Sequence, residues 1–305
     1  MKKHFLVLIL LFGVSCASQQ KGSLNSVDGY SEEDLSWVKN EDFRPTPTVD
    51  YNIREDFYME SLSSDDSLKK ESIERAPKNV LNRIENSENL ISQLASLCYQ
   101  KEDKKASFLM DKMYESYKKN PAYWNQIGTC YLNSDEHQRA ELFYNKALDE
   151  KEDYAPAVNN LGVIYYREQR YQKAMSAFEK ASNINRFSLT PSFNLAQLYL
   201  KFGFIDKAAD IFKALWRQSN SDSDVINALA TVALLRNQID QSLRLYSELE
   251  ESDFRKPEYG LNYAVALKMA NRTDEAFDVL KDLQSSRAQS LSDYQQSVIR
   301  FVRSR

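Results

Sequence analysis

The protein has 305 residues, of which 42% are hydrophobic and 28% are charged, and its formal net charge is −4. A weakly acidic chain has no electrostatic footprint for nucleic acid, so a nucleic-acid-binding protein is not expected. The sequence holds two histidines and three cysteines, and it contains no HExxH motif, CxxC pair or glycine-rich phosphate loop. We therefore expect no metal, no cofactor and no catalytic centre, and we predict that the protein is not an enzyme.

The first 15 residues are typical of an export signal. Lys2 and Lys3 precede the apolar run 5–12, and the small residues 13–15 lead to Cys16. So short an apolar run does not span a bilayer permanently. The segment resembles a bacterial lipoprotein signal with a lipobox at 13–16, although Gly13 stands where leucine is commonest.

This resemblance implies that the chain is cleaved before Cys16, which is lipidated and anchors the protein in a membrane. Ala17 follows in place of the aspartate that signals inner-membrane retention in enteric bacteria. The expected location is therefore the periplasmic face of the bacterial outer membrane. The alternative is an ordinary cleaved signal with an accidental cysteine.

Residues 16–85 have the composition of an acidic, mostly disordered tether. Between 17 and 78, fourteen acidic residues stand against eight basic ones, a net charge of −6. Lys2 and Lys3 add two positive charges, and these two segments together account for the whole net charge of −4. The array that follows is therefore close to neutral. Serine and aspartate are abundant, and Pro45 and Pro47 flank Thr46. Several aromatic residues, including Trp37 and Phe57, are also present. They dock on a partner, pack weakly on the protein's own array or pack on nothing, and these alternatives stay open.

From residue 120 to residue 290 the sequence repeats every 34 residues without an insertion. Pairs of a large residue and a small one recur at one phase, as in Leu161-Gly162, and alanine or serine recurs at a second phase. A large residue follows four places after that alanine or serine. The recurring positions are 127–128, 161–162, 195–196, 229–230 and 263–264, then 140, 174, 208, 242 and 276, then 144, 178, 212, 246 and 280. A small residue lets two helices approach closely, so the period predicts a stacked array of helix pairs.

The pattern resembles the tetratricopeptide repeat, which implies an all-α fold: an α-solenoid of stacked helix-turn-helix units. The predicted array covers 86–305. A degenerate unit at 87–120 precedes units at 121–154, 155–188, 189–222, 223–256 and 257–290, and a capping helix covers 291–302.

Two further cysteines lie on the first helices of adjacent predicted units. An exported chain permits a disulfide between Cys98 and Cys130, but the sequence does not give the Cβ separation that a bridge requires. We favour two separate buried thiols over a disulfide.

In the family that the chain resembles, first helices line a concave groove, and residues beside the Leu-Gly pair point into it. Amide side chains recur here, and an amide can both donate to and accept from a peptide backbone. The resemblance therefore implies partner contacts at Asn125, Thr129, Asn159, Asn160, Arg167, Phe193, Asn194, Gln197, Lys201, Asn227, Thr231 and Asn262. The alternative is that asparagine at these positions serves packing within the family.

The expected function is that of a non-enzymatic scaffold for protein–protein interaction. Lipoproteins with this anchor and repeat serve envelope machines, so the expected partners are envelope proteins or an extended peptide segment. Pilus biogenesis, gliding motility and outer-membrane protein assembly are examples of such machines. The alternative is a regulatory or recruiting subunit of a periplasmic cell-wall enzyme.

Overall fold

A computed structural model describes Pro45, Arg54 and residues 78–86, 88–186, 188–283 and 289–304. The signal peptide, Cys16, the tether aromatics and nearly all of the tether's other residues lie outside the described residues. Within the predicted tether, residues 78–85 form a helix, and Pro45 and Arg54 are buried. Residues 78–85 pack on the next helix of the chain, and Arg54 bonds to residues further along the chain.

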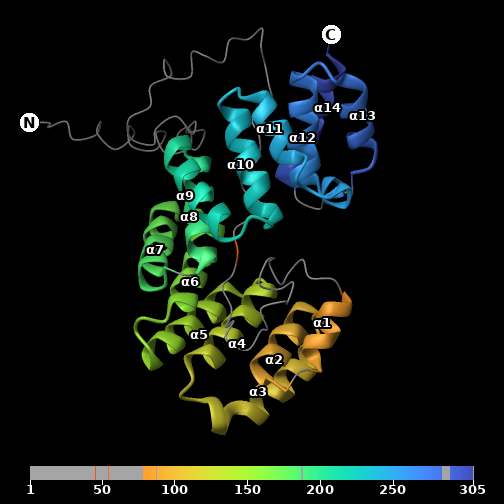
Figure 1. The fold of residues 1–305 in the computed structure, drawn as a ribbon. Helices are drawn as coiled ribbons and strands as arrows, with labels where there is room; N and C mark the ends of the chain where they lie inside the picture. Colours follow the sequence, from red (N-terminus) through yellow and green to blue (C-terminus); the bar gives the residue numbers. More distant parts are fainter. Residues whose placement is uncertain are drawn as a thin grey trace, which may run out of the picture. The chain divides into compact units, whose positions relative to one another are not determined.

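The described chain is a succession of antiparallel helix pairs (Figure 1). After α1 (Lys78–Glu85), the pairs are α2 (Leu90–Tyr99) with α3 (Asp103–Tyr117), α4 (Pro121–Asn133) with α5 (His137–Glu150), α6 (Ala155–Arg167) with α7 (Tyr171–Ile184), α8 (Leu189–Lys201) with α9 (Ile205–Gln218), α10 (Ser223–Leu235) with α11 (Ile239–Tyr246), and α12 (Pro257–Met269) with α13 (Thr273–Lys281). A 3-10 helix, η4 (Glu251–Arg255), lies between α11 and α12, and α14 (Gln289–Arg303) packs on α12. This arrangement confirms the predicted all-α solenoid.

The turn inside each pair has the same backbone conformation. One residue with φ between 58° and 77° recurs at Lys101, Asp135, Gln169, Gly203, Asn237 and Asn271, each 34 residues after the last. Side chains rarely adopt this left-handed conformation, and asparagine, aspartate and glycine tolerate it best. The turn at Lys101 puts α2 and α3 in the same register as the five pairs that follow.

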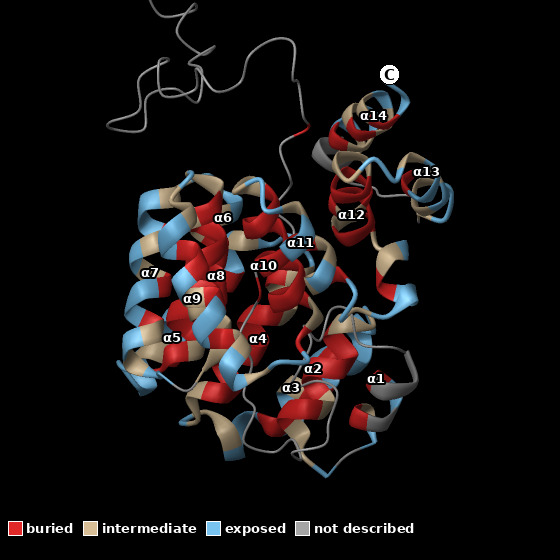
Figure 2. Ribbon diagram, turned by 45° about the horizontal axis from the view of Figure 1, so that its top comes forward, coloured by how far each residue is buried: buried red, intermediate tan, exposed pale blue. Residues whose placement is uncertain are grey.

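The two helices of a pair bury different shares of their residues (Figure 2). The first helix α10 buries eleven of its 13 residues, whereas the second helix α5 buries only Ala140, Tyr144 and Ala147. The spacing of those three residues places them on one helix face. We call α2, α4, α6, α8, α10 and α12 the first helices, and α3, α5, α7, α9, α11 and α13 the second helices.

Glycines in two first helices lie under aromatic rings of the second helices. A Cβ atom built on Gly162 would stand 2.6 Å from the Phe178 ring, and one on Gly128 would stand 2.6 Å from the Tyr144 ring. Both rings are fully buried. In these two units, the small residue of the large–small pair therefore leaves room for the aromatic ring of the second helix.

The two cysteines form a disulfide, which corrects our preference for separate thiols. Cys98 of α2 and Cys130 of α4 are bonded, and their Cα atoms are 5.0 Å apart. The sequence did not reveal that adjacent first helices bring these two positions within bonding distance. The bond links the degenerate helix pair covalently to the pair that follows.

Among the described helices, none is both long and apolar enough to cross a membrane.

Candidate functional site

One residue from the N-terminal segment is buried among the first helices. Arg54 is 6% exposed, and its hydrogen-bond partners lie 105 to 170 residues further along the chain. They belong to α6, α8 and the start of α10. The array thus encloses a residue of a distant segment.

Two asparagines bind the backbone of Arg54. The N–H group of Arg54 donates to Oδ1 of Asn194 at 2.7 Å, and Nδ2 of Asn194 donates to the Arg54 carbonyl oxygen at 2.7 Å. Nδ2 of Asn159 donates to the same carbonyl oxygen at 3.0 Å. A side-chain amide holds both a donor and an acceptor, so Asn194 satisfies both polar groups of one peptide residue. These contacts recognise main chain and are independent of side-chain identity.

Two aspartates and a ring bind the side chain of Arg54. Its Nη1 and Nη2 atoms donate to the two carboxylate oxygens of Asp222 at 3.1 and 3.0 Å, and Nη2 also donates to Asp224. Its Cζ atom lies 3.9 Å from the centroid of the Phe193 ring. A bidentate charged hydrogen bond and a stacked ring match the planar guanidinium group. We call Asn159, Phe193, Asn194, Asp222 and Asp224 the Arg54 site.

The array itself holds the two carboxylates in place. Asp222 is the N-cap of α10 and accepts from the backbone N–H groups of Asp224 and Val225 at 3.0 and 3.3 Å. The hydroxyl group of Tyr259, on α12, donates to Asp224. The N-terminus of a helix also stabilises negative charge. The acidic part of the site is therefore anchored by residues other than Arg54.

A chain of amides fixes the orientation of the two asparagines. Nδ2 of Asn194 donates to Oδ1 of Asn159 at 2.9 Å, and Nδ2 of Asn159 donates to Oδ1 of Asn160 at 3.0 Å. Asn160 in turn donates to Asn125 at 3.1 Å and to Thr129 at 3.5 Å. This chain joins three first helices, α4, α6 and α8, and ends at the backbone of Arg54.

The structure separates the predicted partner-contact residues into two groups. Phe193, Asn194 and Asn159 contact Arg54. Asn125, Thr129 and Asn160 are fully buried, and Asn160 donates to the other two, so these side chains make contacts inside the array and not with Arg54. Their role as partner contacts stays a prediction.

Five of the remaining predicted residues also make contacts within the array, and the sixth, Gln197, is buried. Asn262 donates to Thr231 at 3.2 Å, and Asn227 accepts from Tyr246 at 3.4 Å. Arg167 donates to the Leu132 carbonyl oxygen at 3.1 Å, and the Lys201 ammonium group lies 5.2 Å from the Tyr171 ring centroid. Gln197 is 3% exposed. Their role as partner contacts stays a prediction.

Sequence reasoning missed four residues of this arrangement: Arg54, Asp222, Asp224 and Tyr259. Arg54 is one of eight basic residues in a segment assigned to the tether. The sequence does indicate the position of Asp222 and Asp224, because an Asp-x-Asp sequence is typical of the N-cap at a helix start. It does not indicate which group these carboxylates bind.

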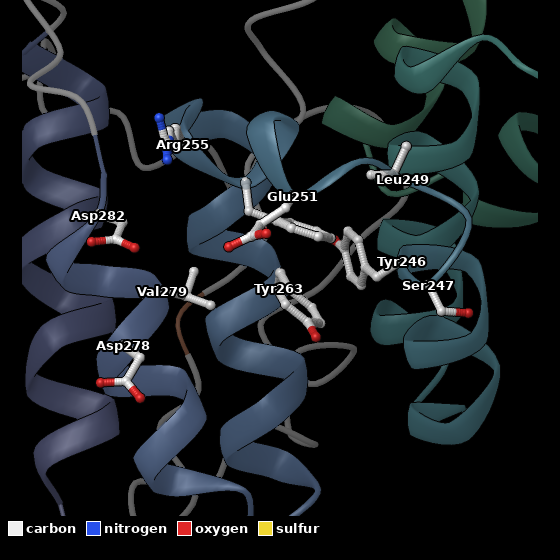
Figure 3. A pocket seen from close by; sticks show the side chains of 10 residues that line it. Tyr246, Ser247, Leu249, Glu251, Arg255, Tyr263, Asp278, Val279 and Asp282 are labelled. Carbon is white, nitrogen blue, oxygen red and sulfur yellow. The ribbon is translucent and has the colours of Figure 1, made fainter.

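A hollow of about 360 Å³ lies where α11, η4, α12 and α13 meet (Figure 3). Tyr246, Phe254 and Tyr263 form its aromatic part, and Glu251, Asp278, Asp282 and Arg255 lie at exposed positions around it. Burial raises the pKa of the Tyr246 hydroxyl well above its usual range, and burial also raises that of Tyr263. Both phenols are therefore neutral near pH 7.

The hollow is a weaker candidate than the Arg54 site, because its charged groups are solvated. Among the described residues, no cluster of three or more histidine, cysteine, aspartate or glutamate side chains is placed to hold a metal ion. The Arg54 site is thus the candidate functional site.

Comparison with known proteins agrees with the helix pairing. Two family models described as "Tetratricopeptide repeat" match residues 121–154 and 155–187. Anaphase-promoting complex subunit 3 of Schizosaccharomyces pombe is 21% identical over 59% of this chain and 27% of its own length. The chain spans about a quarter of the length of the anaphase-promoting-complex relatives that it matches.

Two solved structures have a similar fold. The Cut9–Hcn1 hetero-tetramer structure matches with a TM-score of 0.59 and 18% identity, over 74% of this chain and 45% of that one. PilW, described as a widely conserved type IV pilus biogenesis factor, matches with a TM-score of 0.51 and 17% identity, over 68% of this chain and 99% of that one. Proteins of this kind are generally non-catalytic scaffolds that bind peptides or other proteins. With the 34-residue period, the recurring turn and the two matched repeats, the chain is a tetratricopeptide-repeat protein.

Proposed function

We propose that the protein is a non-enzymatic scaffold of the bacterial envelope, lipid-anchored through Cys16 at the periplasmic face of the outer membrane. In this proposal, its first helices hold a segment of an envelope protein and so support a machine such as one for pilus biogenesis, gliding motility or outer-membrane protein assembly. The tetratricopeptide-repeat fold supports the scaffold role, and the similarity to PilW is compatible with the pilus example.

One observation carries the proposal: Asn194 binds both the N–H and the C=O group of Arg54. Main-chain recognition of this type is what binding a peptide segment of another protein requires. The first helices therefore already bind peptide backbone in this structure.

Two features from different parts of the sequence favour an exported location. The first 16 residues resemble a lipoprotein signal, and Cys98 is bonded to Cys130. Disulfides persist in oxidising compartments such as the periplasm and are rare in the cytosol. The signal and the disulfide are independent, because one is read from the N-terminus and the other from the packing of α2 on α4.

Site-specific photocrosslinking tests the scaffold role. A photoreactive residue is placed in living cells at Lys201 on first helix α8 and, as a matched control, at exposed Lys213 on second helix α9. We expect a discrete envelope protein to crosslink at position 201 and not at 213. Equal crosslinking at both positions, or none at 201, would contradict a partner surface on the first helices.

Metabolic labelling tests the anchor. Cells that express the full chain should incorporate labelled fatty acid into the protein, and Cys16→Ser should abolish that incorporation while Cys98→Ser leaves it unchanged. Labelling that persists in the Cys16→Ser protein would refute the lipoprotein assignment.

A further inference from the structure

We propose that the Arg54 site is an arginine-specific peptide site and that Arg54 occupies it as an intramolecular competitor. A partner would present an arginine-bearing segment and displace Arg54. This inference rests on the proposed function, because it names the class of segment that the scaffold holds.

Different residues of the Arg54 site bind the backbone and the side chain of the bound residue. Asn194 and Asn159 bind the backbone of the bound residue, whatever its side chain. Asp222, Asp224 and Phe193 bind the side chain. Lysine is a compact ammonium group that forms neither the two-pronged bond nor the ring stacking of a guanidinium group. The site therefore selects arginine at one position of a peptide.

The Arg54 site does not depend on Arg54 for its geometry. Asp222 is held by two backbone N–H groups of α10, Asp224 by Tyr259, and Asn194 by Asn159. Every polar group that would receive a new arginine thus has an anchor inside the array. A site with such anchors is preorganised for a ligand that arrives from elsewhere.

Arg54 is displaceable because its neighbours in the sequence are acidic. Glu55 and Asp56 follow it directly in the sequence, and the bound guanidinium faces the carboxylates of Asp222 and Asp224, each 2–3% exposed. Like charges repel, so acidic neighbours weaken the attraction of this segment for an acidic site. An arginine flanked by neutral or basic residues is a better ligand.

Tethering compensates for that weakness. Twenty-three residues separate Arg54 from the start of α1 at Lys78. A segment joined by a short linker competes at an effective concentration on the order of millimolar. The unmodified protein should therefore bind an arginine peptide weakly until a strong or locally concentrated partner displaces Arg54.

The test measures binding of fluorescent peptides to residues 17–305 produced in the periplasm. The probe carries residues 48–60 of this sequence, and a second probe has Glu55 and Asp56 replaced by serine. We expect Arg54→Ala in the protein to raise the affinity for both probes by about tenfold or more, since it removes the competitor. The serine probe should bind more tightly than the natural one.

Three controls assign the effect to the site. A probe with lysine in place of arginine should bind about tenfold more weakly. Asp222→Asn with Asp224→Asn, added to the Arg54→Ala protein, should abolish the gain, and asparagine keeps the N-cap of α10. Arg236→Ala should change nothing, because Arg236 pairs with Asp206 at the exposed surface.

A measurement on the unmodified protein avoids any doubt about folding of the variants. The N–H group of Arg54 donates to Asn194, so its hydrogen exchange should be slow and should accelerate when excess serine probe is added. Equal probe affinity of the unmodified and Arg54→Ala proteins, with an unprotected Arg54 N–H group, would overturn the inference.

The outcomes separate this inference from the proposed function. If Lys201 crosslinks an envelope protein but the peptides do not bind, the scaffold stands and the arginine site falls. If the peptides bind as expected but no partner crosslinks, the arginine site stands and the envelope scaffold falls.

Discussion

The first and second helices of this array differ in how much of their surface is buried. First helices have neighbours on most of their surface, and α10 buries eleven of its 13 residues, including Asp224, Asn227 and Thr231. Second helices such as α5 and α7 bury one stripe of three residues each, and their other residues are partly or fully exposed. Every buried polar group on a first helix therefore needs a partner, and such partners are either other helices or a ligand. The Arg54 site is the place where that need is met by a distant segment.

The largest expected effect comes from cutting the covalent link between two first helices. Cys98→Ser with Cys130→Ser should lower the free energy of unfolding by about 3–4 kcal/mol, because the bond closes a loop with a sequence separation of 32 residues. Urea denaturation measures the change. Reduction of the unmodified protein should reproduce it. A midpoint that does not respond to reductant would show that the bond is absent in solution.

The next test breaks the contact between a first helix and its second helix. Gly162→Leu should cost on the order of 2–3 kcal/mol, since even a Cβ atom would stand 2.6 Å from the buried Phe178 ring. The control is Gly203→Asn, because a Cβ atom built on Gly203 would have no atom within 4 Å other than those of its chain neighbours. Asn237 and Asn271 adopt a similar positive φ in the corresponding turns of other pairs. Thermal denaturation should separate the two variants by several degrees. Equal melting temperatures would mean that the helix contact is wrongly placed.

A smaller effect is expected from one buried amide on a first helix. Asn160→Ala should cost about 1–2 kcal/mol, because Asn125 and Asn159 each lose a hydrogen-bond partner in a fully buried position. The control is Asn145→Ala on the exposed face of second helix α5, where alanine is the better helix former and stability should hold or rise slightly. If both variants were neutral, the chain of amides would carry no net stability.

The same contrast explains what the sequence could and could not predict. The stacked pairs follow from a 34-residue period of small and aromatic residues, which interact within one unit or with the next unit along the chain. The Arg54 site joins residues 105 to 170 positions apart, and its decisive residue lies in a stretch without periodicity. The amides were recognised as a recurring pattern, but the pattern is the same whether an amide bonds to a neighbouring helix, as Asn160 does, or to a peptide, as Asn194 does. Only the packing decides between the two.

The smallest expected effect comes from an arginine in an exposed charge pair at the end of a first helix. Arg236 pairs with Asp206, whose side chain is 91% exposed, whereas Arg54 pairs with carboxylates that are 2–3% exposed. Solvent and salt screen the exposed pair, so Arg236→Ala should change stability by less than about 1 kcal/mol, and by less still at high ionic strength. Denaturation midpoints at low and high salt measure this directly. A cost of several kcal/mol would show that an exposed charge pair also stabilises the array. The first and second helices would then differ only in how many apolar residues they bury.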